Sequence, residues 1–163
     1  MTDLPPGTPE SREMLADFGE LMYEIQLFEF TLVGLVQVQE GEALRGSDQY
    51  GRFVEKLFSE PAGRLRRRAR IKDKEFGERL ERTVDLRNRL VHGWIIYAGL
   101  DLAAGVKTVA AERQALRDAR RNIHYARNRL HAIYAAELEK LPQEEIITPE
   151  RVVELWRECP SDQ

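Results

Sequence analysis

The chain has 163 residues, of which 42% are hydrophobic and 33% are charged, and this composition excludes a disordered chain and predicts a globular protein. The length suits one domain that buries its own core, so we expect a single domain over residues 1–163. A formal net charge of −3 excludes indiscriminate coating of nucleic acid through bulk positive charge. Because Cys159 is the single cysteine, it has no thiol partner and no spacing for zinc, and we expect a cytoplasmic protein without metal or cofactor.

A long first helix is predicted to begin at Thr8-Pro9-Glu10, where threonine can cap the helix and proline suits its first turn. Its apolar residues recur at alternating steps of four and three, which places them on one inward face: Met14, Phe18, Leu21, Ile25, Phe28, Leu32 and Leu35. From residue 25 onward the other faces are apolar too, which predicts a second contact surface such as another subunit; the residues concerned are Phe30, Val33, Val36 and Val38. Polar residues interrupt the stretch 25–38, so we expect a core helix and no membrane span.

The middle of the chain is predicted to hold a loop over 41–48 and a short helix over 49–59 that ends before Pro61. The segment 64–74 contains seven basic residues and one acidic residue. Arg66 and Arg67 are candidate RNA contacts in this run, and a solvated helix flank is the plainer interpretation. A further helix is predicted from about Asp73, with an inward stripe made of Phe76, Leu80, Val84 and Val91.

The last part of the chain is predicted to be irregular over 93–108, because Trp-Ile-Ile-Tyr favours a strand whereas Gly99 and Gly105 favour a loop. A long helix is predicted over 109–141, and Thr148-Pro149-Glu150 predicts a short terminal helix. The pattern as a whole predicts an all-α, up-and-down bundle of four main helices with a short C-terminal helix.

Arg87 stands where the helical periodicity requires a core residue. On a wheel of about 100° per residue it lies within roughly 20° of the centre of the inward stripe, whereas His92 lies about 140° away from it. A guanidinium stays charged, so Arg87 needs an acidic partner, a cleft or an interface. For Arg87 and His92 to act together, either the helix deforms near Gly93 or two subunits converge at a symmetry axis.

The segment Arg87-Asn88-Arg89-Leu90-Val91-His92 resembles the Arg-x4-6-His signature of HEPN domains, including the polar residue that often follows the arginine. The resemblance covers this motif and an all-helical pattern over most of the chain. It implies a helical, commonly dimeric, metal-independent endoribonuclease of a toxin–antitoxin, stress or phage-defence system, with Arg87 and His92 catalytic and Asn88 supporting. The implied partners are a second copy, an RNA substrate and, in some systems, an antitoxin protein. Trp94 stands where one HEPN subgroup has a tyrosine.

Other interpretations of these residues stay open. His92 followed by Gly93 is also typical of a helix C-terminus, and Arg87 is also suited to a structural ion pair, which would leave a non-catalytic module that binds protein or nucleotide. Trp94 is interpreted as a packing residue. A basic face on the last helix supplies further candidate RNA contacts, although such faces are usually only solvated: Arg120, Arg121, His124 and Arg127.

Overall fold

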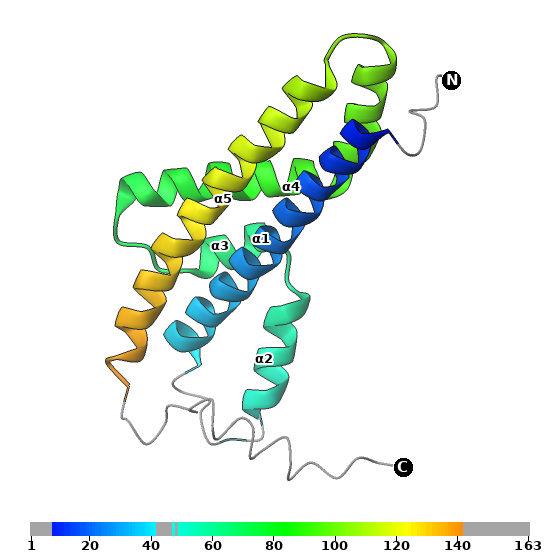
Figure 1. The fold of residues 1–163 in the computed structure, drawn as a ribbon. Coiled ribbons are helices and arrows are strands. Elements are labelled where there is room, and N and C mark those ends of the chain that lie inside the picture. Colours follow the sequence, from blue (N-terminus) through cyan, green and yellow to red (C-terminus); the bar gives the residue numbers. More distant parts are fainter. Residues whose placement is uncertain (1–7, 42–46, 48, 142–163) are drawn as a thin grey trace, which may run out of the picture.

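The computed structural model describes residues 8–41, 47 and 49–141 of the chain. This part of the chain consists of helices without a strand (Figure 1): α1 (Pro9–Glu40), α2 (Gln49–Ser59), α3 (Ala62–Arg68), α4 (Lys74–Ala103) and α5 (Val109–Leu138). The predicted all-α helical fold is confirmed. The short helix expected from Thr148 lies outside the described residues.

Each of the three long helices begins at a side-chain cap. Thr8 Oγ1 accepts a hydrogen bond from the backbone N–H of Ser11, Asp73 accepts one from Phe76, and Thr108 accepts one from the backbone of α5. Such caps satisfy backbone donors that have no partner inside the helix. The predicted starts of α1, α4 and α5 are therefore confirmed, as are the bounds of α2.

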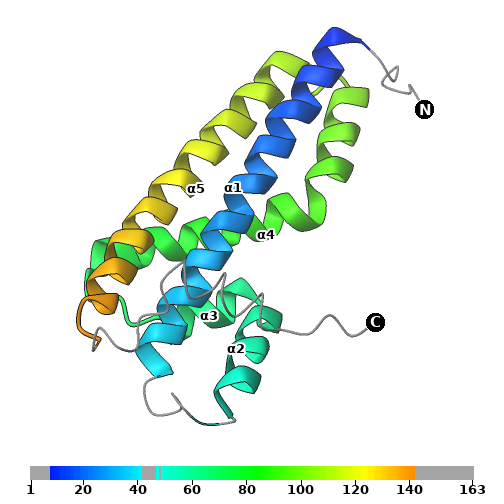
Figure 2. The same ribbon diagram turned by 60° about the horizontal axis from the view of Figure 1, so that its bottom comes forward.

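Helices α1 and α5 lie side by side and run in the same direction (Figures 1 and 2). Four pairs of oppositely charged side chains across their interface share a sequence separation of 100 residues: Glu13 with Arg113, Asp17 with Arg117, Glu20 with Arg120, and Glu24 with His124. A constant separation requires parallel helices, because it would change steadily along an antiparallel pair. The up-and-down arrangement expected from short connections is therefore wrong, since α2, α3 and α4 together return the chain to the end where it began.

Helix α4 crosses the α1/α5 pair and then bends (Figure 2). Near its start the guanidinium of Arg79 lies 3.8 Å from the ring centre of Tyr125 in α5. Further along, Trp94 stacks on Phe18 of α1 with 4.3 Å between ring centres. The last part of α4 therefore lies against the first part of α1.

The expected irregular segment over 93–108 is wrong for its first eleven residues, because α4 stays helical to Ala103. Gly105 follows the C-cap of α4, and its φ of 68° lies in the left-handed region that favours glycine. The N–H of Gly105 donates to the carbonyl of Leu102 and that of Val106 to Asp101, which is the Schellman pattern of helix ends.

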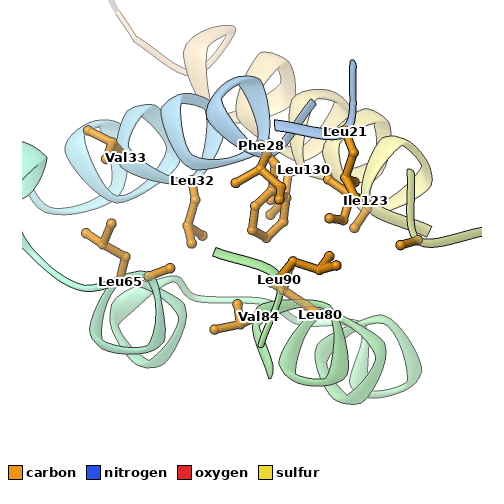
Figure 3. Close-up of a cluster of buried hydrophobic side chains, with 14 of the residues drawn as sticks. Leu21, Phe28, Leu32, Val33, Leu65, Leu80, Val84, Leu90, Ile123 and Leu130 are labelled. Atoms are coloured by element: carbon orange, nitrogen blue, oxygen red, sulfur yellow. The ribbon is translucent and has the colours of Figure 1, made fainter. Parts of the chain in front are cut away.

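The core fills the space where α1, α3, α4 and α5 meet. Figure 3 shows its side chains pointing toward one another from these four helices: Leu21, Phe28, Leu32, Val33, Leu65, Leu80, Val84, Leu90, Ile123 and Leu130. The predicted inward stripes of α1 and α4 are buried here, with Phe18 and Val91 partly exposed at the edge. Val33 and Val36, which were expected on a second surface, are buried as well, whereas Phe30 is exposed.

Among the described helices, α1 is long and apolar enough to cross a membrane by length and composition. A core helix passes the same test, and α1 carries the buried stripe of this bundle.

Candidate functional site

Arg87 is held by an acidic residue of α1. Its Nε donates to Glu29 Oε1, and its Nη1 donates to the Oδ1 of Asn88 at 3.0 Å. The Arg87 side chain is 18% exposed and that of Glu29 is 29% exposed, so the pair lies at the edge of the core. Glu29 is therefore the acidic partner that Arg87 requires, and it belongs to the same chain. The cavity beside Arg87 also supplies part of the cleft.

A cavity of about 190 Å³ opens beside Arg87, between α1, α4 and the segment that joins α2 to α3. Phe30 and Phe58 form one apolar side, with their rings edge to face at 5.6 Å between centres. Glu29 and Glu60 supply two carboxylates to the lining. Because Arg87 is the one cation among the described residues that line it, the cavity does not attract a phosphate while Glu29 holds the guanidinium.

His92 lies on a different side of α4 from Arg87. The helix continues through both residues, and a step of five residues corresponds to about 140° around the axis of a straight helix. His92 is exposed and shares its face with two exposed apolar residues, Ile96 and Leu100. At Gly93 a Cβ atom would lie 2.7 Å from the Tyr97 ring, so glycine lets Tyr97 fold back against the helix beside the motif.

The candidate RNA contacts on α5 are engaged in ion pairs. Arg120 pairs with Glu20, and Arg121 pairs with Asp118 of its own helix. The buried carboxylate of Glu24 contacts the other two candidates. Arg127 Nη1 lies 3.0 Å from its Oε2, and His124 Nδ1 lies 3.3 Å from its Oε1.

Except for the pair of Arg121 with Asp118, these contacts join α5 to α1, and together they offset much of the positive charge that the sequence places on this face. Asn128 completes the cluster, since its Nδ2 lies 3.0 Å from His124 Nε2. Both ring nitrogens of His124 therefore have a partner.

The two arginines singled out near α3 differ in their surroundings. Arg66 Nη2 donates to the backbone carbonyl of Gly77 at 2.9 Å, which ties α3 to the first turns of α4. A Cβ at Gly77 would lie 3.2 Å from this guanidinium, so glycine allows the close approach. Arg67 is exposed, and the part of the chain that the structure describes gives it no ion pair or hydrogen bond.

A buried group that the sequence did not reveal lies between α4 and α5. The indole Nε1 of Trp94 donates to Glu112 Oε1 at 2.7 Å, and Lys107 Nζ lies 3.2 Å from Glu112 Oε2. Glu112 is only 3% exposed. A buried indole N–H needs an acceptor, so the sequence predicts that a partner exists but not which residue it is. The packing interpretation of Trp94 is confirmed.

Among the described residues, no group of three or more histidine, cysteine or acidic side chains is placed to hold a metal ion. Comparison of the chain with protein-family models, with curated proteins and with solved structures finds no match.

Proposed function

We propose that the chain is a metal-independent endoribonuclease of the HEPN type that acts as a homodimer, in a toxin–antitoxin, stress or phage-defence system. The observation that supports this most directly is the position of Arg87. Its charged group lies on the wall of a cavity and donates a hydrogen bond to the side-chain oxygen of Asn88, the next residue of the motif. A guanidinium at this place can meet a phosphate once Glu29 releases it.

A second copy of the chain is part of this proposal because Arg87 is held by Glu29 at the edge of the core, whereas His92 is exposed on another side of α4. His92 borders an exposed apolar face on α4, where Ile96 is 63% and Leu100 61% exposed. Leu15, Tyr23 and Phe30 of α1 are similarly exposed. A second copy that covers these exposed side chains around a two-fold axis brings the motifs of two subunits together.

The reaction proposed for this site is attack by a ribose 2′-hydroxyl on the adjacent phosphate. His92 takes the proton from the attacking hydroxyl, and the second His92 of the dimer donates a proton to the departing 5′-oxygen. Arg87 stabilises the negative charge of the pentavalent phosphate. The products are a 2′,3′-cyclic phosphate and a free 5′-hydroxyl, so atoms and protons balance without a metal ion.

The test is RNA cleavage by the purified protein in the presence of EDTA. We expect the RNA fragments produced by the wild type to end in a cyclic phosphate. His92→Ala and Arg87→Ala are expected to be inactive, although their thermal unfolding shows that they are folded. His131→Ala is the matched control, because His131 is an exposed histidine of α5 outside the motif. Cleavage that His92→Ala retains in full would assign the activity to another site.

A second candidate function is a non-catalytic module that binds a partner through the same cavity. The ion pair between Arg87 and Glu29 favours this module, because an arginine with a purely structural role is expected to form such a pair. The two aromatic rings of the cavity suit a cationic side chain of a partner protein, and Glu60, which pairs with Arg68 through Oε1, keeps Oε2 without a hydrogen bond among the described residues. Wild type and His92→Ala that are equally inert toward RNA would favour this module.

A further inference from the structure

Two exposed aromatic rings border the cavity beside Arg87. Phe30 of α1 is 59% exposed and Phe58, near the end of α2, is 54% exposed, although the two rings are in edge-to-face contact. Together with Val33 and Leu65 in the lining of the cavity, they form an apolar surface to which α1, α2 and α3 contribute. Large apolar side chains that gather in this way mark a place where another segment packs.

The described residues of this lining carry more negative than positive charge. Glu29 and Glu60 stand against one cation, Arg87, which Glu29 already engages. Glu29 accepts from Arg87 through Oε1 and keeps 29% of its side chain exposed, so its carboxylate can accept from a second cation. A segment that covers the surface is therefore expected to combine apolar side chains with a positive charge.

The sequence contains such a segment in residues 149–157, which lie outside the described part of the chain. It follows the helix start predicted at Thr148. On a helical wheel the apolar residues Val152, Leu155 and Trp156 lie within about 100° of one another. Arg151 lies about 40° beyond Leu155, at the edge of this stripe. The sequence thus predicts a short helix with a large ring, two aliphatic side chains and a cation on one side.

The position of the end of α5 brings this segment within reach of the two rings. The end of α5 lies beside the end of α1 (Figure 2), and Leu141 lines a cavity together with Val38 and Gln39. Phe30 precedes Gln39 by nine residues on α1, which is about 14 Å along the helix axis. Residues 142–148 span up to roughly 23 Å when they are extended. The connection is therefore long enough without any change in the described helices.

We infer that residues 149–157 pack as an amphipathic helix against Phe30 and Phe58 of the same chain. Arg151 then pairs with Glu29, and the helix covers the cavity together with the motif arginine in its lining. Charge complementarity and the length of the connection are the observations that favour this occupant over a partner protein.

The docked segment inhibits the proposed site, because it covers the guanidinium that is proposed to meet a phosphate. In this respect the inference rests on the proposed function, and release of the segment is a condition for activity. Phe30 is then taken by the segment, so the dimer relies on Ile96 and Leu100 of α4.

Quenching of a bimane label by Trp156 tests the position of the segment, because an indole quenches bimane only near contact. The label is attached to Gln26→Cys, an exposed residue of the cavity lining, in the 163-residue chain that also carries Cys159→Ser. We expect Trp156→Phe to raise the emission of this label. A label on Gln114→Cys, exposed at the start of α5, is the matched control and is expected to emit equally with and without Trp156. Equal emission at position 26 with and without Trp156 would overturn the inference.

Variants of the two contact surfaces test how the segment is held. Phe58→Ser is expected to lower the docking constant about tenfold or more, the effect of losing one large apolar contact. Val106→Ser, at an exposed position outside the cavity, is the control and is expected to leave quenching unchanged. Arg151→Glu is expected to weaken docking, most strongly at low salt. Full quenching in Phe58→Ser would place the segment on another surface and overturn the inference.

A mixing experiment identifies which chain supplies the segment. Labelled protein with Trp156→Phe is mixed with unlabelled protein that retains Trp156, and we expect no quenching. Quenching in the mixture would assign the segment to a second copy and overturn docking within one chain.

RNA cleavage separates this inference from the proposed nuclease. If both hold, Trp156→Ser cleaves RNA faster than the wild type. Quenching at position 26 in a protein that cleaves no RNA would refute the nuclease and leave the docked segment standing, whereas cleavage without quenching would do the reverse. Quenching combined with unchanged cleavage in Trp156→Ser would overturn the inhibitory role.

Discussion

The guanidinium of Arg87 on α4 is paired with the carboxylate of Glu29 on α1, 58 residues earlier in the chain. This contact decides whether the motif arginine is free to meet a phosphate. It also joins two helices at the edge of the core. Its removal therefore has separate effects on RNA affinity and on stability.

We expect Glu29→Gln to raise the affinity of the protein for RNA, and its cleavage activity, because the amide no longer neutralises Arg87. The cost in unfolding free energy is expected to be about 1 kcal/mol or less, the range of partly exposed ion pairs. Filter binding and chemical denaturation measure the two effects. Glu13→Gln is the control, since Glu13 also pairs from α1 but with Arg113, away from the motif. Unchanged RNA affinity in Glu29→Gln would contradict a role of Arg87 in binding phosphate.

The contact between Trp94 and Glu112 is expected to stabilise the junction of α4 and α5. Replacing Glu112 by Ala leaves the indole N–H buried without an acceptor, which costs about 1–3 kcal/mol. A double-mutant cycle with Trp94→Phe and Glu112→Ala measures the coupling between them, and we expect the two losses not to add. Additive losses would show that the hydrogen bond contributes nothing of its own.

Phe28 is the largest of the fully buried side chains of the core. Phe28→Ala is expected to lower the unfolding free energy by about 3–5 kcal/mol, because it removes buried apolar surface and leaves a cavity. Leu15→Ala, at an exposed position of the same helix, is expected to change it by about 0.5 kcal/mol or less. Urea denaturation of both variants checks the assignment of the inward face of α1.

The stability of the protein is expected to fall in alkaline solution through Tyr134. Burial raises the pKa of Tyr134 above its ordinary value, so the folded chain holds this proton more tightly than the unfolded chain. The resulting contribution is complete below the unfolded pKa of about 10 and is lost as the pH rises through the folded value. Tyr134→Phe removes the titration, and its thermal melting point is expected to fall less steeply than that of the wild type between pH 9 and 11. Parallel curves would contradict this source.

The exposed face around His92 is expected to hold the dimer together. Ile96→Glu and Leu100→Glu place a charge on this face and are expected to give monomers in sedimentation velocity, whereas the wild type sediments as a dimer. Val106→Glu, exposed but beyond the end of α4, is the control and is expected to stay dimeric. A monomeric wild type at micromolar concentration would remove the support for a site shared by two subunits.

The sequence was sufficient to predict the features that depend on neighbouring residues. The cap at Thr8, the helix start near Asp73 and the stripe that includes Phe28 follow from local chemistry and helical spacing, and the structure has them. The end of α4 was missed because β-branched and aromatic residues were interpreted by their intrinsic preference. Trp94 and Ala98, which are four residues apart, lie on the same side of the helix, and both are buried. This packing outweighs the strand preference of the residues between them.

Features that depend on distant residues were not predictable in the same way. The helical wheel shows that Arg87 needs an acidic partner, a cleft or an interface, but nothing near it in the sequence points to Glu29. The parallel direction of α1 and α5 was also hidden, since it depends on pairings such as Glu20 with Arg120. Short connections predicted that successive helices would alternate in direction. The prediction is wrong because α4 crosses the α1/α5 pair.

The parallel pairing of α1 with α5 has a consequence for how the chain reaches its native state. Because the partners lie 100 residues apart, loop closure must span most of the protein before this interface forms. During synthesis α1 emerges from the ribosome first, and its apolar stripe has to wait for α5. We therefore expect folding to be completed only after α5 has been synthesised. Until then the exposed apolar stripe of α1 is expected to bind chaperones.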